Sequence, residues 1–162
     1  MFQAIVNGLF IDRQTAEPVI LLQEKDGSKR LPIWVRFNEM VALAIEISQK
    51  ELQPRRPFSH DLTQHILESL DAVVARAVID SLEDHIYRAK LFFETEANLL
   101  EIDSRPSDAV ILALKFDAPI FVHESVLEEH LHLTKSSGNS PEELYERFQQ
   151  VKPDDISGLS AG

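Results

Sequence analysis

The 162-residue sequence contains no cysteine, which excludes disulfides, thiolate metal sites and cysteine nucleophiles. It has no glycine-rich phosphate loop, which argues against the classes of nucleotide-dependent enzyme that use one. No apolar run is long enough to span a membrane, and the first residues lack the basic segment of a secretion signal. We therefore expect a cytoplasmic protein with no membrane partner.

The sequence also has fewer basic than acidic residues. It contains 16 Lys and Arg and 27 Asp and Glu, which gives a formal net charge of −11. This balance argues against binding nucleic acid through a broad basic surface. It remains compatible with an enzyme whose acidic residues hold a divalent cation at a small local site. The length and the hydrophobic share of 44% are typical of one globular domain with its own core.

Hydrophobic patterning predicts strands at residues 2–11, 19–23 and 31–35, followed by a helix at 38–49. A helix at 59–70, with Ser59 as N-cap and leucine or isoleucine at every fourth position, leads to strands at 72–79 and 86–93. A further strand beginning at Leu99 turns at Pro106 into a buried helix. A short strand at 118–122, a short helix ending at His130 and a helix at 140–150 complete the pattern.

An internal repeat organises these elements. Residues 31–44 align with residues 100–113, with Leu, Ile, Arg, Val, Leu and Ala in matching places. We therefore predict an α+β fold with duplicated β-β-β-α units at about 2–49 and 71–117, a mixed or antiparallel sheet, a connecting helix and a C-terminal helical appendage. The domain is expected to span 1–133, and residues 134–162 to form a linker, a short helix and a disordered tail.

The turn from strand to helix in the second copy gathers Asp103, Arg105, Ser107 and Asp108. The N–H groups and positive dipole end of a helix start favour a phosphate there, and two carboxylates suit a divalent cation. Arg105 and Asp108 also have a structural explanation. The first copy of the repeat has the same pattern, Arg36 followed three positions later by an acidic residue, which is typical of an ion pair at a helix start.

Asp103 has no such counterpart, since the aligned residue of the first copy is Trp34. A carboxylate in place of an aromatic ring favours a functional site. In the helix at 59–70, His60 and Asp61 fall in the first turn, where a neutral His60 is either a metal ligand or general base, or a surface and capping residue. His123, His130 and His132 form a weaker candidate metal cluster.

Four segments resemble one known family. Residues 56–62, Arg-Pro-Phe-Ser-His-Asp-Leu, resemble the Arg-Pro-x-Thr-His-Asp-Leu element of the bifunctional nuclease domain family. Residues 103–110, Asp-Ser-Arg-Pro-Ser-Asp-Ala-Val, resemble its Asp-Ala-Arg-Pro-Ser-Asp-Ala-Ile element, and residues 31–34 and 118–122 match two more in the right order. The resemblance spans about residues 2–130. One departure is Val35-Arg36, where the family usually has Ile-Gly.

The resemblance implies a compact, often dimeric α+β domain with nuclease activity on RNA and DNA. Our leading hypothesis is a nuclease in which Asp103 and Asp108 hold Mg²⁺ or Mn²⁺, with Asp61 as a further ligand, and His60 is the general acid or base. The remaining predicted site residues are Arg105, which neutralises charge on the phosphate, and Ser107 and Arg56, which contact substrate. The alternative is a non-catalytic, dimeric binding or regulatory domain in which the same residues cap helices and form ion pairs.

Overall fold

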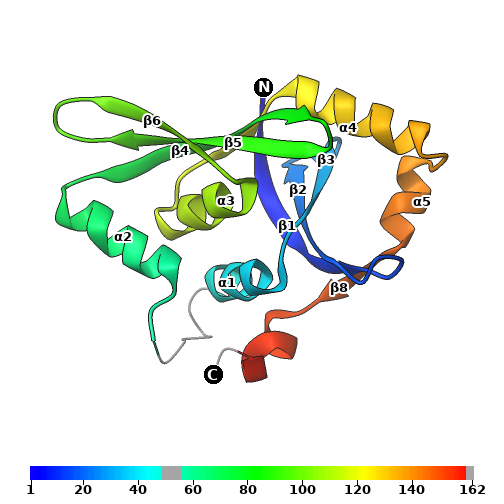
Figure 1. Cartoon of the computed structure of the whole chain (residues 1–162), viewed down its shortest axis with the longest axis horizontal. Coiled ribbons are helices and arrows are strands. Elements are labelled where there is room, and N and C mark those ends of the chain that lie inside the picture. Colours follow the sequence, from blue (N-terminus) through cyan, green and yellow to red (C-terminus); the bar gives the residue numbers. More distant parts are fainter. Residues whose placement is uncertain (49–55, 160–162) are drawn as a thin grey trace.

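The computed structural model describes residues 1–48 and 56–159, which form a mixed α+β fold around one open sheet (Figure 1). Its strand order is β3-β2-β1-β7-β4-β5-β6, and β8 pairs with β1 outside this path. The strands are β1 (Phe2–Asp12), β2 (Pro18–Glu24), β3 (Arg30–Trp34), β4 (Val73–Glu83), β5 (Ile86–Glu94), β6 (Leu99–Ser104), β7 (Ile120–Val122) and β8 (Phe148–Val151). The predicted α+β class is confirmed.

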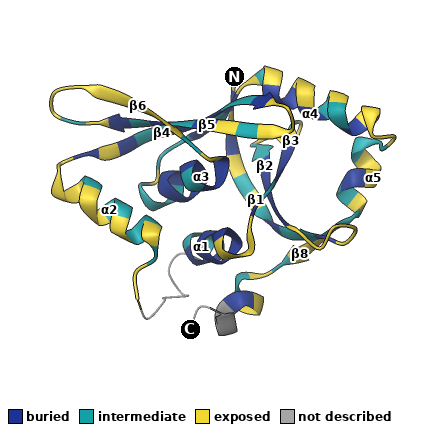
Figure 2. Cartoon of the chain, viewed as in Figure 1, coloured by how far each residue is buried: buried dark blue, intermediate teal, exposed yellow. Residues whose placement is uncertain are grey.

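The described residues also form five α-helices. They are α1 (Phe37–Ile47), α2 (Ser59–Ser69), α3 (Pro106–Lys115), α4 (Glu124–Ser136) and α5 (Pro141–Glu146), with a 3-10 helix, η1 (Pro153–Leu159). Helices α1 and α3 contact each other, and their apolar stripes, including Leu43, Val110 and Ile111, are fully buried in the core (Figures 1 and 2). No helix in the described part of the chain has the length and apolar character needed to cross a membrane.

The two halves of the chain have the same element order. Strands β1, β2 and β3 form an antiparallel meander that leads into α1, and β4, β5 and β6 form another that leads into α3. Strand β7 joins the meanders because Ile120 pairs with Ala4 of β1 on one side and with Ala77 of β4 on the other. As a result, the starts of α1 and α3 lie close together. An origin by duplication stays a prediction.

The C-terminal region differs from the sequence prediction. The helix expected at 140–150 ends at Glu146, and Phe148–Val151 instead pairs with β1 as β8. The reason is tertiary: Phe148 packs edge-on against the ring of Trp34, and Arg147 forms an ion pair with the fully buried Asp12.

Other boundaries are also longer or shorter than predicted. Helix α4 continues to Ser136, beyond its expected end at His130, and β4 continues to Glu83. Residues 157–159, expected to be disordered, belong to η1, whose Ile156 is buried, whereas residues 160–162 lie outside the described residues. Position 49, the expected end of the first helix, also lies outside them. The domain boundary at 133 stays a prediction.

Candidate functional site

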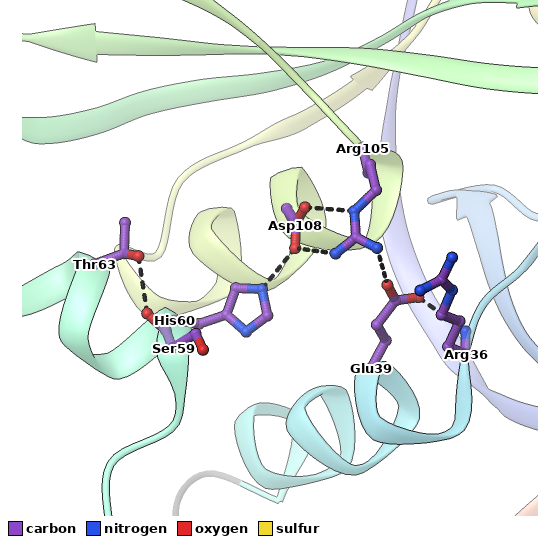
Figure 3. A network of polar contacts seen from close by, with 7 residues as sticks. All are labelled: Arg36, Glu39, Ser59, His60, Thr63, Arg105 and Asp108. Atoms are coloured by element: carbon purple, nitrogen blue, oxygen red, sulfur yellow. Dashed lines mark hydrogen bonds and ion pairs between the residues drawn. The ribbon is translucent and has the colours of Figure 1, made fainter.

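The structure brings His60, from the start of α2, together with Arg105 and Asp108, from the start of α3 (Figure 3). His60, in the first turn of α2, places its Nε2 2.8 Å from Oδ1 of Asp108 in the first turn of α3. Arg105, the N-cap residue of α3, donates from Nε to Oδ2 of the same carboxylate at 2.9 Å and from Nη2 to Oδ1 at 3.1 Å. Three of the five predicted catalytic residues therefore form one hydrogen-bonded group.

The group continues into the first half of the fold through Glu39 of α1. Arg105 Nη1 lies 2.7 Å from Glu39 Oε1, and the backbone N–H of Arg36 donates to Glu39 Oε2 at 2.8 Å. His60, Asp108, Arg105 and Glu39 thus form a polar row across the starts of α2, α3 and α1 (Figure 3). Glu39 was not predicted as a site residue, although its alignment with Asp108 in the repeat was an available signal.

The polar row sets the protonation of Asp108. The hydrogen bond from His60 lowers the pKa of Asp108 to about 2, against the opposing effect of burial and with further help from Arg105. An ionised carboxylate only accepts hydrogen bonds, so Nε2 of His60 carries the proton of this contact. The lone pair of the neutral ring then lies on Nδ1, for which the described residues supply no hydrogen-bond partner. His60 is thereby oriented to accept a proton at Nδ1.

Asp61, although next to His60, belongs to a different group. Its Oδ1 contacts Lys115 Nζ, which also lies 2.5 Å from Glu46 Oε1, and its Oδ2 accepts from the backbone N–H of Phe58 at 2.7 Å. Asp61 therefore closes the first turn of α2 and fixes it to α3. Phe58 is the N-cap residue, so the prediction that Ser59 caps this helix is wrong.

Asp103 lies apart from the polar row. It occupies β6 opposite Lys90, and the preceding residue, Ile102, pairs with the buried Leu91. Because neighbouring residues of a strand point to opposite faces, Asp103 faces away from the core, and none of its contacts within the described residues joins it to Asp108. Of the predicted substrate contacts, Ser107 is buried in the first turn of α3 and Arg56 is exposed at the edge of the described residues.

The predicted cation ligands, Asp103 and Asp108, do not converge in this arrangement. Both oxygens of Asp108 are engaged by His60 and Arg105, and Asp103 does not face them. Among the described residues, no group of three or more His, Asp or Glu side chains is arranged to hold a metal ion. This also applies to His123, His130 and His132, since His130 Nδ1 instead lies 2.9 Å from the hydroxyl of Tyr87.

A cavity of about 740 Å³ lies beside the polar row, between the starts of α1 and α3, the β4–β5 turn and α4. Arg105 and Glu39 contribute to its wall. The site therefore combines an oriented histidine with an adjoining space for a ligand.

An α+β domain with this polar row at its helix starts matches the model of the bifunctional nuclease domain over residues 20–134. The chain belongs to that family. It is 31% identical over 166 residues to an uncharacterized protein of Mycobacterium tuberculosis, found in strains CDC 1551 / Oshkosh and ATCC 25618 / H37Rv, covering 96% of this chain and 98% of the relative. It is 28% identical over 123 residues to bifunctional nuclease 2 of Oryza sativa subsp. japonica, covering 74% of this chain and 37% of the rice protein.

Proposed function

We propose that this protein hydrolyses phosphodiester bonds in DNA and RNA, with His60 as the general base. The observation that carries the proposal is the 2.8 Å contact between His60 Nε2 and Asp108 Oδ1. This contact holds the ring in one tautomer and leaves Nδ1 as the basic nitrogen. Family membership and the name of the rice relative support the same reaction class.

In the proposed step, a water molecule attacks phosphorus while His60 Nδ1 takes one of its protons. A bond forms from the water oxygen to phosphorus, the bond to the leaving oxygen breaks, and the leaving oxygen takes a proton from solvent. The ionised Asp108 stabilises the imidazolium that forms. Three of the five N–H groups of Arg105 are used by Asp108 and Glu39, so two remain to donate to phosphate oxygens.

Dependence on Mg²⁺ or Mn²⁺ stays a prediction, and no part of the proposed step passes through a cation. The cytoplasmic location expected from the sequence also stays a prediction.

Cleavage assays with highly purified protein test the proposal. We expect wild type to cut single-stranded DNA, double-stranded DNA or RNA, and His60→Ala to lower kcat/KM by about 10²–10⁴, the usual contribution of a positioned general base. His65→Ala is the matched control, because His65 is an exposed histidine on the same helix. Equal cutting by wild type and His60→Ala would identify a contaminant or a different base. Parallel assays with Mg²⁺, Mn²⁺ or chelator, and with Asp103→Asn, test the cation.

A second candidate function is a non-catalytic binding or regulatory domain. The observation that favours it is that Arg105 is held by two carboxylates, Asp108 and Glu39, as expected of a structural ion-pair network. Absence of cleavage by folded wild-type protein, under every cation condition, would favour this function over the nuclease.

We also propose that the protein is a homodimer. Helix α2 has no buried residue, and Leu62, Ile66 and Leu70 along it are 58%, 51% and 69% exposed. Exposed apolar residues also lie on β4 and β6, at the same end of the molecule as α2 (Figure 2). We call this end the α2–β6 surface; its exposed apolar residues are Leu62, Ile66, Leu70, Val73, Leu99, Leu100 and Ile102.

A second copy of the chain is the partner that this surface fits. Seven large side chains, each about half exposed, present apolar area on the order of several hundred Å², near the upper limit for a monomer. A stable dimer buries about 800 Å² per partner, so the surface supplies a large part of an interface. Strand β6 is the last strand of the sheet order, and its free edge offers backbone groups for pairing with a second β6.

A further inference from the structure

The cavity beside the polar row is lined by apolar side chains and by a set of charged ones. Its apolar wall comes from the β4–β5 hairpin, α4 and α5, through Leu82, Ile86, Leu133 and Leu144. Arg36 and Arg105, the residues that precede α1 and α3, also line the cavity together with Glu17, Glu39 and Arg147, and we call these charged residues its rim. A volume of about 740 Å³ exceeds that of a single flat aromatic ring system with a sugar attached.

The lining also contains a hydrogen-bonded pair of polar side chains, the half-buried Tyr87 and the buried His130. His130 is 5% exposed, and burial lowers its pKa to about 4 and raises the pKa of Tyr87, so both are neutral at physiological pH. A phenol is the stronger acid and an imidazole nitrogen the stronger base, so the Tyr87 hydroxyl donates to His130 Nδ1 over their 2.9 Å contact. The ring proton is then on Nε2, which has no partner among the described residues and is free to donate to a ligand.

The arginines of the rim differ in whether a carboxylate already pairs with them. Arg147 is neutralised by Asp12, and Arg105 is held by Asp108 and Glu39. The guanidinium of Arg36 has no carboxylate within ion-pair distance among the described residues, since its bond to Glu39 uses the backbone N–H. Arg36 is therefore the rim cation that is available to an anionic group.

We propose that the cavity binds one unstacked nucleotide of the substrate. The base lies against the apolar wall, accepts a hydrogen bond from His130 Nε2 and leaves its phosphate at the rim beside Arg36. This inference rests on the proposed nuclease function, because Arg105 both lines the cavity and bonds the Asp108 that orients His60. A base must leave its stack to enter, so the site favours single strands and strand ends over an intact duplex.

The single tryptophan of the chain provides a direct readout, because Trp34 lines the cavity. Titration of wild-type protein with AMP and dAMP is expected to change Trp34 fluorescence saturably, and inorganic phosphate alone is not. His130→Phe retains the ring volume but removes the donor, and it should raise the Kd about fivefold, the effect of one neutral hydrogen bond. Arg36→Gln should raise it about tenfold through loss of a charge-assisted bond.

Matched variants separate these effects from general damage. His132→Phe, an exposed histidine of the same helix, and Arg88→Gln, an exposed arginine of β5, should leave the Kd unchanged. If AMP and dAMP give no saturable change up to millimolar concentration, or if phosphate reproduces their effect, the nucleotide site is overturned. An equal loss in His130→Phe and His132→Phe also overturns it.

Cleavage assays show whether the nucleotide site alone is wrong or whether the proposed nuclease function is wrong as well. If wild type cleaves nucleic acid but does not bind mononucleotides, the proposed nucleotide site is overturned and the proposed nuclease function is not. Loss of cleavage in His60→Ala with unchanged AMP binding supports both, because His60 does not line the cavity. Faster cleavage of an intact duplex than of the matching single strand contradicts the proposed preference.

Discussion

Arg105 and Glu39 join the two halves of the fold, with Arg105 Nη1 2.7 Å from Glu39 Oε1. Each residue stands at the start of the helix that ends its own β-β-β-α unit. Glu39 is 5% exposed and has two partners, the guanidinium of Arg105 and the backbone N–H of Arg36. This ion pair therefore fixes the relative position of α1 and α3, on which the polar row depends.

Replacing Glu39 should destabilise the fold. Glu39→Gln removes the charge that faces Arg105, and because the Arg105 side chain is 56% exposed we expect a loss of about 1–2 kcal/mol in the free energy of unfolding, below the cost for a fully buried pair. Urea denaturation measures it. The control is Glu101→Gln, which breaks a solvent-accessible ion pair with Lys90 and should cost less stability than Glu39→Gln. Equal losses would contradict a special role for Glu39.

We expect Asp61 to contribute to the stability of the fold rather than to catalysis. Asp61→Asn weakens the contact with Lys115 and the cap at Phe58, so we expect faster hydrogen exchange of α2 amides and a loss of about 1–2 kcal/mol. Cleavage per folded molecule should fall far less than in His60→Ala. A loss of kcat as large as that of His60→Ala, with α2 exchange unchanged, would restore Asp61 to the catalytic group.

His130 should make stability depend on pH. Its pKa is lowered by burial to about 4 in the folded chain, against about 6.5 in an unfolded one, so between these values the unfolded state binds the extra proton. Its contribution is fully present above about pH 6.5 and is lost as the pH falls toward 4, by roughly 3 kcal/mol in total.

Denaturation of wild type and His130→Phe across that pH range provides the measurement. The variant should lose less stability on acidification than wild type. His132→Phe is the control and should follow the wild-type curve, since His132 is exposed. Parallel curves for wild type and His130→Phe would refute the assignment.

Disruption of the α2–β6 surface should produce monomers. Ile66→Lys places a charge in the middle of the apolar stripe of α2, so we expect a concentration-dependent shift toward the monomer in sedimentation velocity, with no loss of thermal stability in the monomer itself. Ile5→Ser, which alters an exposed apolar residue of β1, is the control. A wild-type protein that remains monomeric at high concentration would refute the dimer.

The strand and helix order of the two meanders, and the helix starts that carry polar residues, were predictable from the sequence. Alternation of apolar residues along strands and their four-residue spacing along helices are local properties, and Pro106 marks the beginning of α3 by itself. The motifs at residues 56–62 and 103–110 also identified the family before any contact was known.

The pairing of these polar residues was decided only by tertiary structure. His60 meets Asp108 across 48 residues because α2 docks at the start of α3, and no local pattern encodes that contact. The sequence favoured Asp103 over Asp108 as a site residue, but the pleat of β6 turns Asp103 away from the core. The same limit explains β8, because residues 148–151 became a strand only where the edge of β1 and the rings around Phe148 were available to receive them. Local periodicity determines which face of an element is apolar, whereas the partner of each polar side chain depends on how distant elements pack.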